Sequence, residues 1–129
     1  MKRVFVVDDE PDVVELIETV LELAGYGVES ETSGRRALTR ILENPPDLVL
    51  LDLMMPDLDG MELLKLLRAQ PQGADIPVVI VSARTGQLDQ IGSLQLGANA
   101  YICKPFSNSE LVAQVEQLIG GAGNESNDA

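Results

Sequence analysis

Short apolar runs alternate along the chain with longer segments in which apolar residues recur at helical spacing. Four of the runs are continuous and rich in β-branched residues: residues 4–7, 48–51, 78–81 and, more weakly, 100–103. Continuous apolar runs of this length predict strands that are buried on both faces, as in a parallel sheet. Residues 27–31 alternate apolar and polar positions instead, which predicts a strand at the edge of the sheet.

Five segments with helical periodicity follow these runs in turn. Their apolar residues include Val13 and Ile17, Ala37 and Ile41, Leu64 and Leu67, Leu88, Ile91, Leu94 and Leu96, and Leu111 and Val115. The last segment opens with Ser107 and Glu110 in the S-x-x-E pattern of a capping box, which predicts a helix start. Alternation of strands and helices with short connections predicts right-handed βαβ crossovers, and hence a doubly wound α/β fold, a (βα)5 sandwich of three layers.

The length of the chain allows one domain. A chain of 129 residues buries roughly two thirds of its unfolded surface around a single core. After residue 119 the sequence changes to glycine and small or acidic residues, with no large apolar side chain. We therefore expect a folded domain over residues 1–120 and a flexible tail or truncated linker over residues 121–129.

The chain is strongly acidic, with 21 acidic and 9 basic residues and a formal net charge of -12 at pH 7. This charge repels nucleic acids and anionic membranes, so we expect neither as a direct partner. No apolar run approaches the roughly 20 residues that span a bilayer, and the first residues lack the apolar core of a signal peptide. We therefore expect a cytoplasmic protein.

Histidine is absent and Cys103 is the single cysteine. The chain therefore has no imidazole for acid–base chemistry, no histidine ligands for zinc, no intrachain disulfide and no CxxC redox motif. Any chemistry must use carboxylates, hydroxyls and lysine.

Each predicted buried strand is followed directly by a polar residue. Asp8 and Asp9 follow the first such strand, Asp52 the second, Ser82 the third and Lys104 the last. Open parallel sheets form their sites outside the carboxyl ends of the strands, so we expect these five side chains to converge at one edge.

Three carboxylates at one edge need a compensating charge, because two charges ~4 Å apart repel by about 4 kcal/mol at an effective dielectric constant of about 20. Lys104 supplies one positive charge, and a bound divalent cation would supply more. Oxygen ligands without histidine or cysteine favour Mg²⁺, with Mn²⁺ or Ca²⁺ as alternatives. Beside such an ion, Asp52 is a candidate nucleophile that could accept a phosphoryl group as an acyl phosphate.

Four motifs and the spacing between them carry a family resemblance. They are VVDDEP at residues 6–11, LLDLMMPDLDG at 50–60, VSAR at 81–84 and LGANAYICKPF at 96–106. In this combination the chain resembles the receiver domains of two-component response regulators over residues 2–119. The resemblance implies a flavodoxin-like, five-stranded parallel sheet of order 2-1-3-4-5.

The resemblance also implies a role for each residue at this edge. Asp52 would be the phospho-acceptor. Asp9, the carboxylate of Asp52 and the backbone carbonyl of Met54 would bind Mg²⁺ directly, and Asp8 would act mainly through a bound water. Ser82 would donate its hydroxyl to the phosphoryl group.

A conformational switch is implied by the same resemblance. Lys104 would pair with the phosphoryl group, and the peptide bond between Lys104 and Pro105 would be cis. Tyr101 would be the switch aromatic, which turns inward when Ser82 moves toward the phosphate. The face formed by the fourth helix, the fifth strand and the fifth helix would then change its conformation, and a partner protein would recognise that change.

The resemblance thus implies a signalling switch rather than an enzyme, one that promotes its own phosphorylation and a slow autodephosphorylation. The phosphodonor would be a sensor histidine kinase or a phosphotransfer protein, or a small acyl phosphate. A C-terminal output domain or a separate effector would receive the signal, from a monomer or a phosphorylation-dependent homodimer. Asn99 and Ala100 depart from the acidic residues that dimerising relatives usually carry there. Bulky Met54 and Arg84 predict a persistent phosphoryl group.

Three other functions compete with this one. Phosphatases with an aspartate nucleophile commonly carry a second Asp two residues later, where this chain has Met54. A nucleotide- or flavin-binding domain would need a GxGxxG or GxxxxGK[ST] loop after a strand, and the sequence has none. The alternative that stays open is a pseudo-receiver, a protein-interaction module not controlled by phosphorylation, although such a domain is expected to lack one of the five polar groups.

Overall fold

The computed structural model describes residues 1–121 and contains one sheet of five parallel strands. The strands are β1 (Arg3–Val7), β2 (Gly27–Glu31), β3 (Leu48–Leu51), β4 (Val78–Ser82) and β5 (Ala100–Cys103). Their order, β2-β1-β3-β4-β5, confirms the predicted doubly wound, flavodoxin-like fold. Apart from Gly121, the predicted tail lies outside the described residues, and the domain limit at residue 120 stays a prediction.

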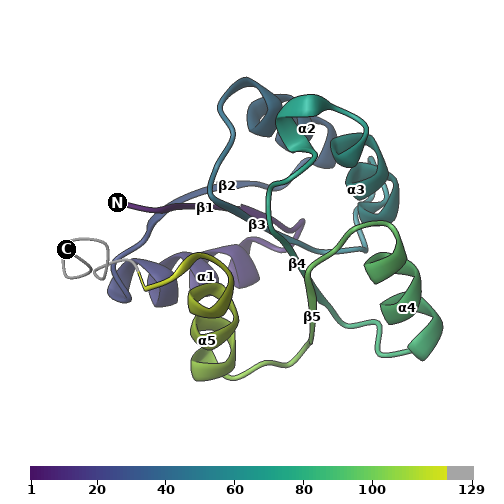
Figure 1. Cartoon of the computed structure of the whole chain (residues 1–129). Helices are drawn as coiled ribbons and strands as arrows, with labels where there is room; N and C mark the ends of the chain where they lie inside the picture. The colour runs from purple at the N-terminus through teal and green to yellow at the C-terminus, as the bar shows by residue number, and fades with distance from the viewer. Residues whose placement is uncertain (122–129) are drawn as a thin grey trace.

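Five helices cover the two faces of the sheet and complete the three predicted layers (Figure 1). One face carries α1 (Pro11–Leu23) and α5 (Asn108–Ile119), and the other carries α2 (Gly34–Glu43), α3 (Gly60–Arg68) and α4 (Gln87–Gln95). A short 3-10 turn, η1 (Pro71–Gly73), precedes β4 and was not predicted from the sequence.

The central strands fill a core on each side of the sheet. Every residue of β3 and β4 is buried, whereas every residue of β2 is only partly buried, as expected for an edge strand. Phe5 packs on the side of α2 and α3, and its neighbour Val6 packs on the side of α1 and α5. Because successive strand residues point to opposite faces, a continuous apolar run can supply both cores.

Side chains fix the starts of three helices. Ser33, Asp59 and Ser107 each accept a hydrogen bond from a backbone N–H in the first turn of the helix that follows. The cap at Ser107 confirms the helix start that the S-x-x-E pattern predicts. Gly25 and Gly97 follow the ends of α1 and α4 with φ of 97° and 107°, a conformation that favours glycine.

Helix α4 lies where the sequence predicts a helix, but three of the four apolar residues that predict it point outward, and only Leu96, just after the helix, packs against the core. Leu88 is 86% exposed, and Ile91 and Leu94 are 50% and 48% exposed. The helix turns small residues toward the rest of the molecule instead: Ser93 is fully buried, and a Cβ at Gly92 would lie 3.1 Å from the side chain of Met61. Helical periodicity identifies a helix face, but the neighbours decide which face is buried.

Candidate functional site

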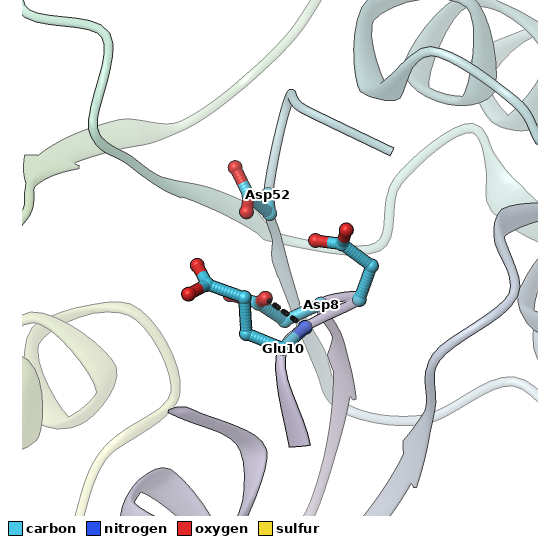
Figure 2. A group of neighbouring side chains, drawn as sticks. Asp8, Glu10 and Asp52 are labelled. Atoms are coloured by element: carbon cyan, nitrogen blue, oxygen red, sulfur yellow. Dashed lines mark hydrogen bonds between the residues drawn. The ribbon is translucent and has the colours of Figure 1, made fainter. Parts of the chain in front are cut away.

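The acidic residues predicted to converge do lie together at the carboxyl ends of β1 and β3. These two strands are neighbours, and the Asp52 N–H donates to the carbonyl of Val7, 2.9 Å away, so the register continues one residue beyond the strands. Asp8 and Asp52 are almost fully buried, at 2% and 3% exposed. Oxygens of Asp8, Asp9, Glu10 and Asp52 lie within 4.8 Å of one another. Figure 2 shows Asp8, which follows β1, and Glu10, which precedes α1, beside Asp52, which follows β3.

Lys104, at the end of β5, reaches across to this acidic cluster. Its Nζ lies 2.8 Å from Oδ2 of Asp8, 3.1 Å from Oδ2 of Asp52 and 3.4 Å from Oε1 of Glu10. The Lys104 N–H also donates to the carbonyl of Ser82, 2.8 Å away, which fixes the end of β5 against the end of β4. The peptide bond between Lys104 and Pro105 is cis, as the family resemblance implies.

One ammonium does not balance the carboxylates around it. Burial by itself would lower the pKa of Lys104, but the hydrogen bonds and charges of Asp8 and Asp52 outweigh burial and raise that pKa. Burial raises the pKa of Asp8, and the negative charge of Asp52 raises it further; the hydrogen bonds from Lys104 and the Glu10 N–H oppose this rise without cancelling it. The site is therefore short of positive charge, which favours the binding of a cation.

The cluster opens into a cleft of about 270 Å³, lined by Asp9, Glu10, Asp52, Met54, Ala83 and Lys104. Asp52 is held in place from both sides, since its Oδ1 accepts a hydrogen bond from the Met54 N–H at 3.1 Å and its Oδ2 faces Lys104. Met54 is 51% exposed at the rim. A small phosphate-containing group could approach Asp52 through this cleft.

Ser82 and Tyr101, the predicted switch residues, lie beside the cleft rather than in its lining. Ser82 is fully buried at the end of β4, and its Oγ accepts a hydrogen bond from the Arg84 N–H at 3.2 Å. Tyr101 is partly buried, and its hydroxyl donates to the Arg84 carbonyl at 2.7 Å. Both side chains thus hold Arg84, in the loop between β4 and α4. Burial raises the pKa of the Tyr101 hydroxyl.

A family model described as the response regulator receiver domain matches residues 4–116. This chain belongs to that family. Transcriptional regulatory protein PrrA of Mycobacterium tuberculosis is 42% identical over 121 residues, which are 94% of this chain and 51% of PrrA. The chain spans about half the length of the curated relatives it matches.

Solved receiver domains have the same fold. The BeF3-activated N-terminal receiver domain of Klebsiella pneumoniae RstA matches with a TM-score of 0.84 and 36% identity, over 92% of this chain and 98% of that one. The receiver domain of the Pseudomonas aeruginosa sensor histidine kinase PA1611 matches with a TM-score of 0.85 and 32% identity, over 93% and 98% of the two chains. That structure has a magnesium ion coordinated in its active-site cleft.

The donor atoms of this receiver domain fit such an ion. The acidic cluster offers carboxylate oxygens within 4.8 Å of one another, without histidine or cysteine. Hard oxygen donors of this kind suit Mg²⁺, and Mn²⁺ takes similar ligands. Asp8, Asp9 and Asp52 were predicted as ligand residues together with the Met54 carbonyl, and the three carboxylates lie together as expected.

Glu10 and Ala83 line the cleft without having been predicted as site residues. Glu10 could have been suspected, because it continues the acidic run Asp8-Asp9 at the end of a buried strand. An exposed glutamate at the start of a helix is equally typical of a solvated surface, and the sequence offers no means to choose.

No helix in the described part of the chain is both long and apolar enough to cross a membrane.

Proposed function

We propose that this receiver domain is a phospho-accepting switch in which Asp52 takes a phosphoryl group from a histidine of a partner protein. The observation that supports this most is the setting of Asp52: its carboxylate is buried, lines the cleft and lies 3.1 Å from the Lys104 ammonium. The donor would be a sensor histidine kinase or a phosphotransfer protein, and a small acyl phosphate could replace it. The chain itself contains no histidine.

In the transfer, an oxygen of the Asp52 carboxylate forms a bond to phosphorus while the bond from phosphorus to the donor nitrogen breaks. The electron pair of the broken bond stays on the imidazole, which takes up a proton from solvent. The product is an acyl phosphate at Asp52. An ionised carboxylate needs no base to attack, so the lack of histidine in the receiver does not hinder this step.

Four groups would hold Mg²⁺, with Mn²⁺ as the alternative ion. Asp9, the Asp52 carboxylate and the Met54 carbonyl would bind it directly, and Asp8 would bind it through a water. When bound, the ion would neutralise charge on the phosphoryl oxygens as they transfer. The nearby carboxylate of Glu10 adds negative charge, which attracts a cation to the cleft.

Phosphorylation would then change the contacts around the cleft. It adds about 1.5 to 2 negative charges and three acceptor oxygens. Lys104 would pair with these oxygens, and the Ser82 hydroxyl would turn from the Arg84 N–H toward them. Because Tyr101 donates to the carbonyl of the same Arg84, a shift of this loop would also move Tyr101.

The face formed by α4, β5 and α5 is the surface that we propose the switch controls. A C-terminal output domain, or a separate effector in the cytoplasm, would bind this face according to its state. The receiver domain itself would act as a monomer or as a homodimer that forms on phosphorylation. Met54 lies exposed at the rim of the cleft, and its bulk should hinder an attacking water, so we expect slow autodephosphorylation.

The test is to incubate the protein with acetyl phosphate, with and without Mg²⁺, and to measure its intact mass. We expect the mass of one added phosphoryl group in the presence of Mg²⁺, little in excess chelator and none in Asp52→Ala. No gain with Mg²⁺, or an equal gain in Asp52→Ala, would contradict the proposal and favour a pseudo-receiver that is not controlled by phosphorylation.

A further inference from the structure

Asp57 lies in the loop between β3 and α3, five residues after Asp52, and its carboxylate reaches the start of another helix. Its oxygens accept hydrogen bonds from the Ser33 hydroxyl at 2.7 Å, the Gly34 N–H at 3.0 Å and the Arg35 N–H at 3.2 Å. These groups form the first turn of α2. The loop that follows Asp52 is therefore bonded to the N-terminus of α2, a helix that the proposed chemistry does not use.

These bonds are strong for a junction that is only partly buried. A carboxylate that accepts backbone N–H groups at a helix N-terminus forms charge-assisted hydrogen bonds and interacts favourably with the helix dipole. The Ser33 hydroxyl and the Gly34 and Arg35 N–H groups lower the pKa of Asp57 to about 2, so the carboxylate is charged at neutral pH. The two segments also approach closely, since a Cβ at Gly34 would lie 3.1 Å from the Cβ of Leu58.

Leu58, next to Asp57, packs partly buried against the core, and two further anchors lie nearer the base of the loop. The Gly60 N–H donates to the Leu53 carbonyl at 2.9 Å, which closes the loop. Met55 is only 8% exposed and packs in the core beneath α2 and α3. Met54 lies between them, exposed at the rim, with its N–H on Asp52. Asp57, beside Leu58, holds the outer part of the loop, the part that the two anchors nearer the base do not reach.

We propose that Asp57 is a positioning residue for the metal and phosphoryl site, which it holds in shape by tying the loop of Met54 to the first turn of α2. Asp57 does not touch the reacting atoms. It limits how far the loop can swing, and so fixes the direction of the Met54 carbonyl, a proposed metal ligand, and of the Met54 N–H, which orients Asp52. This inference rests on the proposed function of Asp52.

The tie also implies an effect in the opposite direction. If the junction with α2 favours metal binding, metal binding must stabilise the junction to the same degree. In the wild-type protein, Mg²⁺ should therefore slow hydrogen exchange of the Gly34 and Arg35 amides, although no proposed ligand belongs to α2.

The experiment measures the Mg²⁺ dissociation constant by NMR titration of ¹⁵N-labelled protein, for the wild type, Asp57→Ala, Asp57→Asn and Ile41→Val. Ile41 is a fully buried residue of α2 that does not contact the loop junction through any hydrogen bond, so Ile41→Val destabilises the helix and leaves the tie intact. We expect Asp57→Ala to bind Mg²⁺ about fivefold more weakly, less than the roughly 10- to 100-fold loss when a direct partner of a metal ligand is removed. Asp57→Asn should weaken binding to a smaller degree, and Ile41→Val should bind as the wild type does.

A second readout needs no metal. In the metal-free protein, hydrogen exchange of the Gly60 and Met54 amides should be faster in Asp57→Ala than in Ile41→Val. If Asp57→Ala does not fold, Asp57→Asn decides the matter in both measurements.

Several results would overturn the inference. Wild-type Mg²⁺ affinity in the Asp57 variants would show that the tie does not position the site, and equal weakening in Ile41→Val would assign the effect to helix stability. Either result would leave the proposed function intact. Failure of the wild-type protein to bind Mg²⁺ would instead overturn the proposed function, and this inference with it.

Discussion

Helices α3 and α4 lie side by side on one face of the sheet and show similar apolar spacing, yet they are held in opposite ways. Leu64 and Leu67 of α3 are fully buried in the core, whereas Leu88 of α4 is 86% exposed and Ile91 50% exposed. The one residue of α4 that is fully buried is Ser93. A helix that buries so little apolar surface can change its position at a smaller cost in free energy. The proposed switch surface thus contains the least anchored helix of the described part.

The two ends of α4 also differ. At its C-terminal end, the guanidinium of Arg68, from α3, donates to the Gly97 carbonyl at 2.8 and 3.2 Å. At its N-terminal end, Gly86 offers no side-chain cap, and the nearest ion pair joins Arg84 and Asp89 at 3.6 Å. We therefore expect α4 to move mainly at its first turn, the end nearer the cleft.

The largest expected effect is a difference in stability between truncating a buried side chain of α3 and truncating an exposed one of α4. Leu64→Ala should lower the free energy of unfolding by about 2 to 5 kcal/mol, because it leaves a cavity in a closed core. Leu88→Ala should change it by less than about 0.5 kcal/mol, since the side chain is already in solvent. Urea unfolding of both variants measures the difference, and similar losses in the two would contradict the contrast between α3 and α4.

Sequence patterns predicted the strands well because burial on both faces leaves a continuous apolar run. The same patterns could not predict the orientation of α4. Its periodicity matches that of α3, but the side it buries carries Ser93 and Gly92, and the Met61 side chain approaches closely at Gly92. That contact joins residues 31 positions apart in the sequence, and no local pattern encodes it.

The residues of the candidate site likewise divide into those that the sequence could place and those that it could not. Asp8, Asp9, Asp52 and Lys104 could be placed in advance, because each follows a strand and parallel strands end at one edge. The role of Asp57 could not be predicted, because its contact with Ser33 depends on how two loops that follow different strands approach each other in space. A residue is predictable here when the backbone of the sheet positions it.

Mg²⁺ should distinguish the two loops that flank the cleft. At ten times its dissociation constant, Mg²⁺ should raise the free energy of unfolding by about 1.4 kcal/mol, because it binds the folded state alone. The proposed ligands Asp52 and Met54 belong to the loop before α3, so amide exchange should slow there and stay unchanged in α4. Thermal unfolding and hydrogen exchange with and without Mg²⁺ test both points.

Asp9→Asn provides the control for this prediction, since it removes a proposed ligand that is partly exposed. Most of the Mg²⁺-dependent stabilisation should disappear in that variant. An absence of stabilisation in the wild-type protein, or equal protection of α4, would count against a metal site on the α3 side of the cleft.

The Asp57 carboxylate gives the junction between the loop before α3 and α2 a pH dependence. Its pKa in the folded protein is about 2, below the ordinary 3.8, so its stabilising effect is complete above pH 3.8 and is lost as the pH falls through about 2. Because the junction lies at the surface, we expect a contribution of about 1 kcal/mol, typical of a helix cap. ¹³C NMR titration of the Asp57 carboxyl measures the pKa directly.

Ser33→Ala tests the cause of this shift, because the Ser33 hydroxyl makes the largest contribution to it. In that variant the pKa of Asp57 should rise toward its ordinary value. A pKa near 3.8 in the wild-type protein would mean that the loop and α2 are not joined as described.

The smallest expected effect concerns the hydroxyl of Tyr101, which holds the loop before α4 as Asp57 holds the loop before α3. Tyr101→Phe removes a neutral hydrogen bond to the Arg84 carbonyl, and water can replace it in part, so the loss should be about 1 kcal/mol or less. Hydrogen exchange should nevertheless quicken in residues 84–90 and stay unchanged in α3. Tyr26→Phe is the matched control, because its hydroxyl donates to a backbone carbonyl, that of Gly120, away from α4. Faster exchange of α4 in both variants would mean that global stability, rather than the tie to Arg84, governs the mobility of α4.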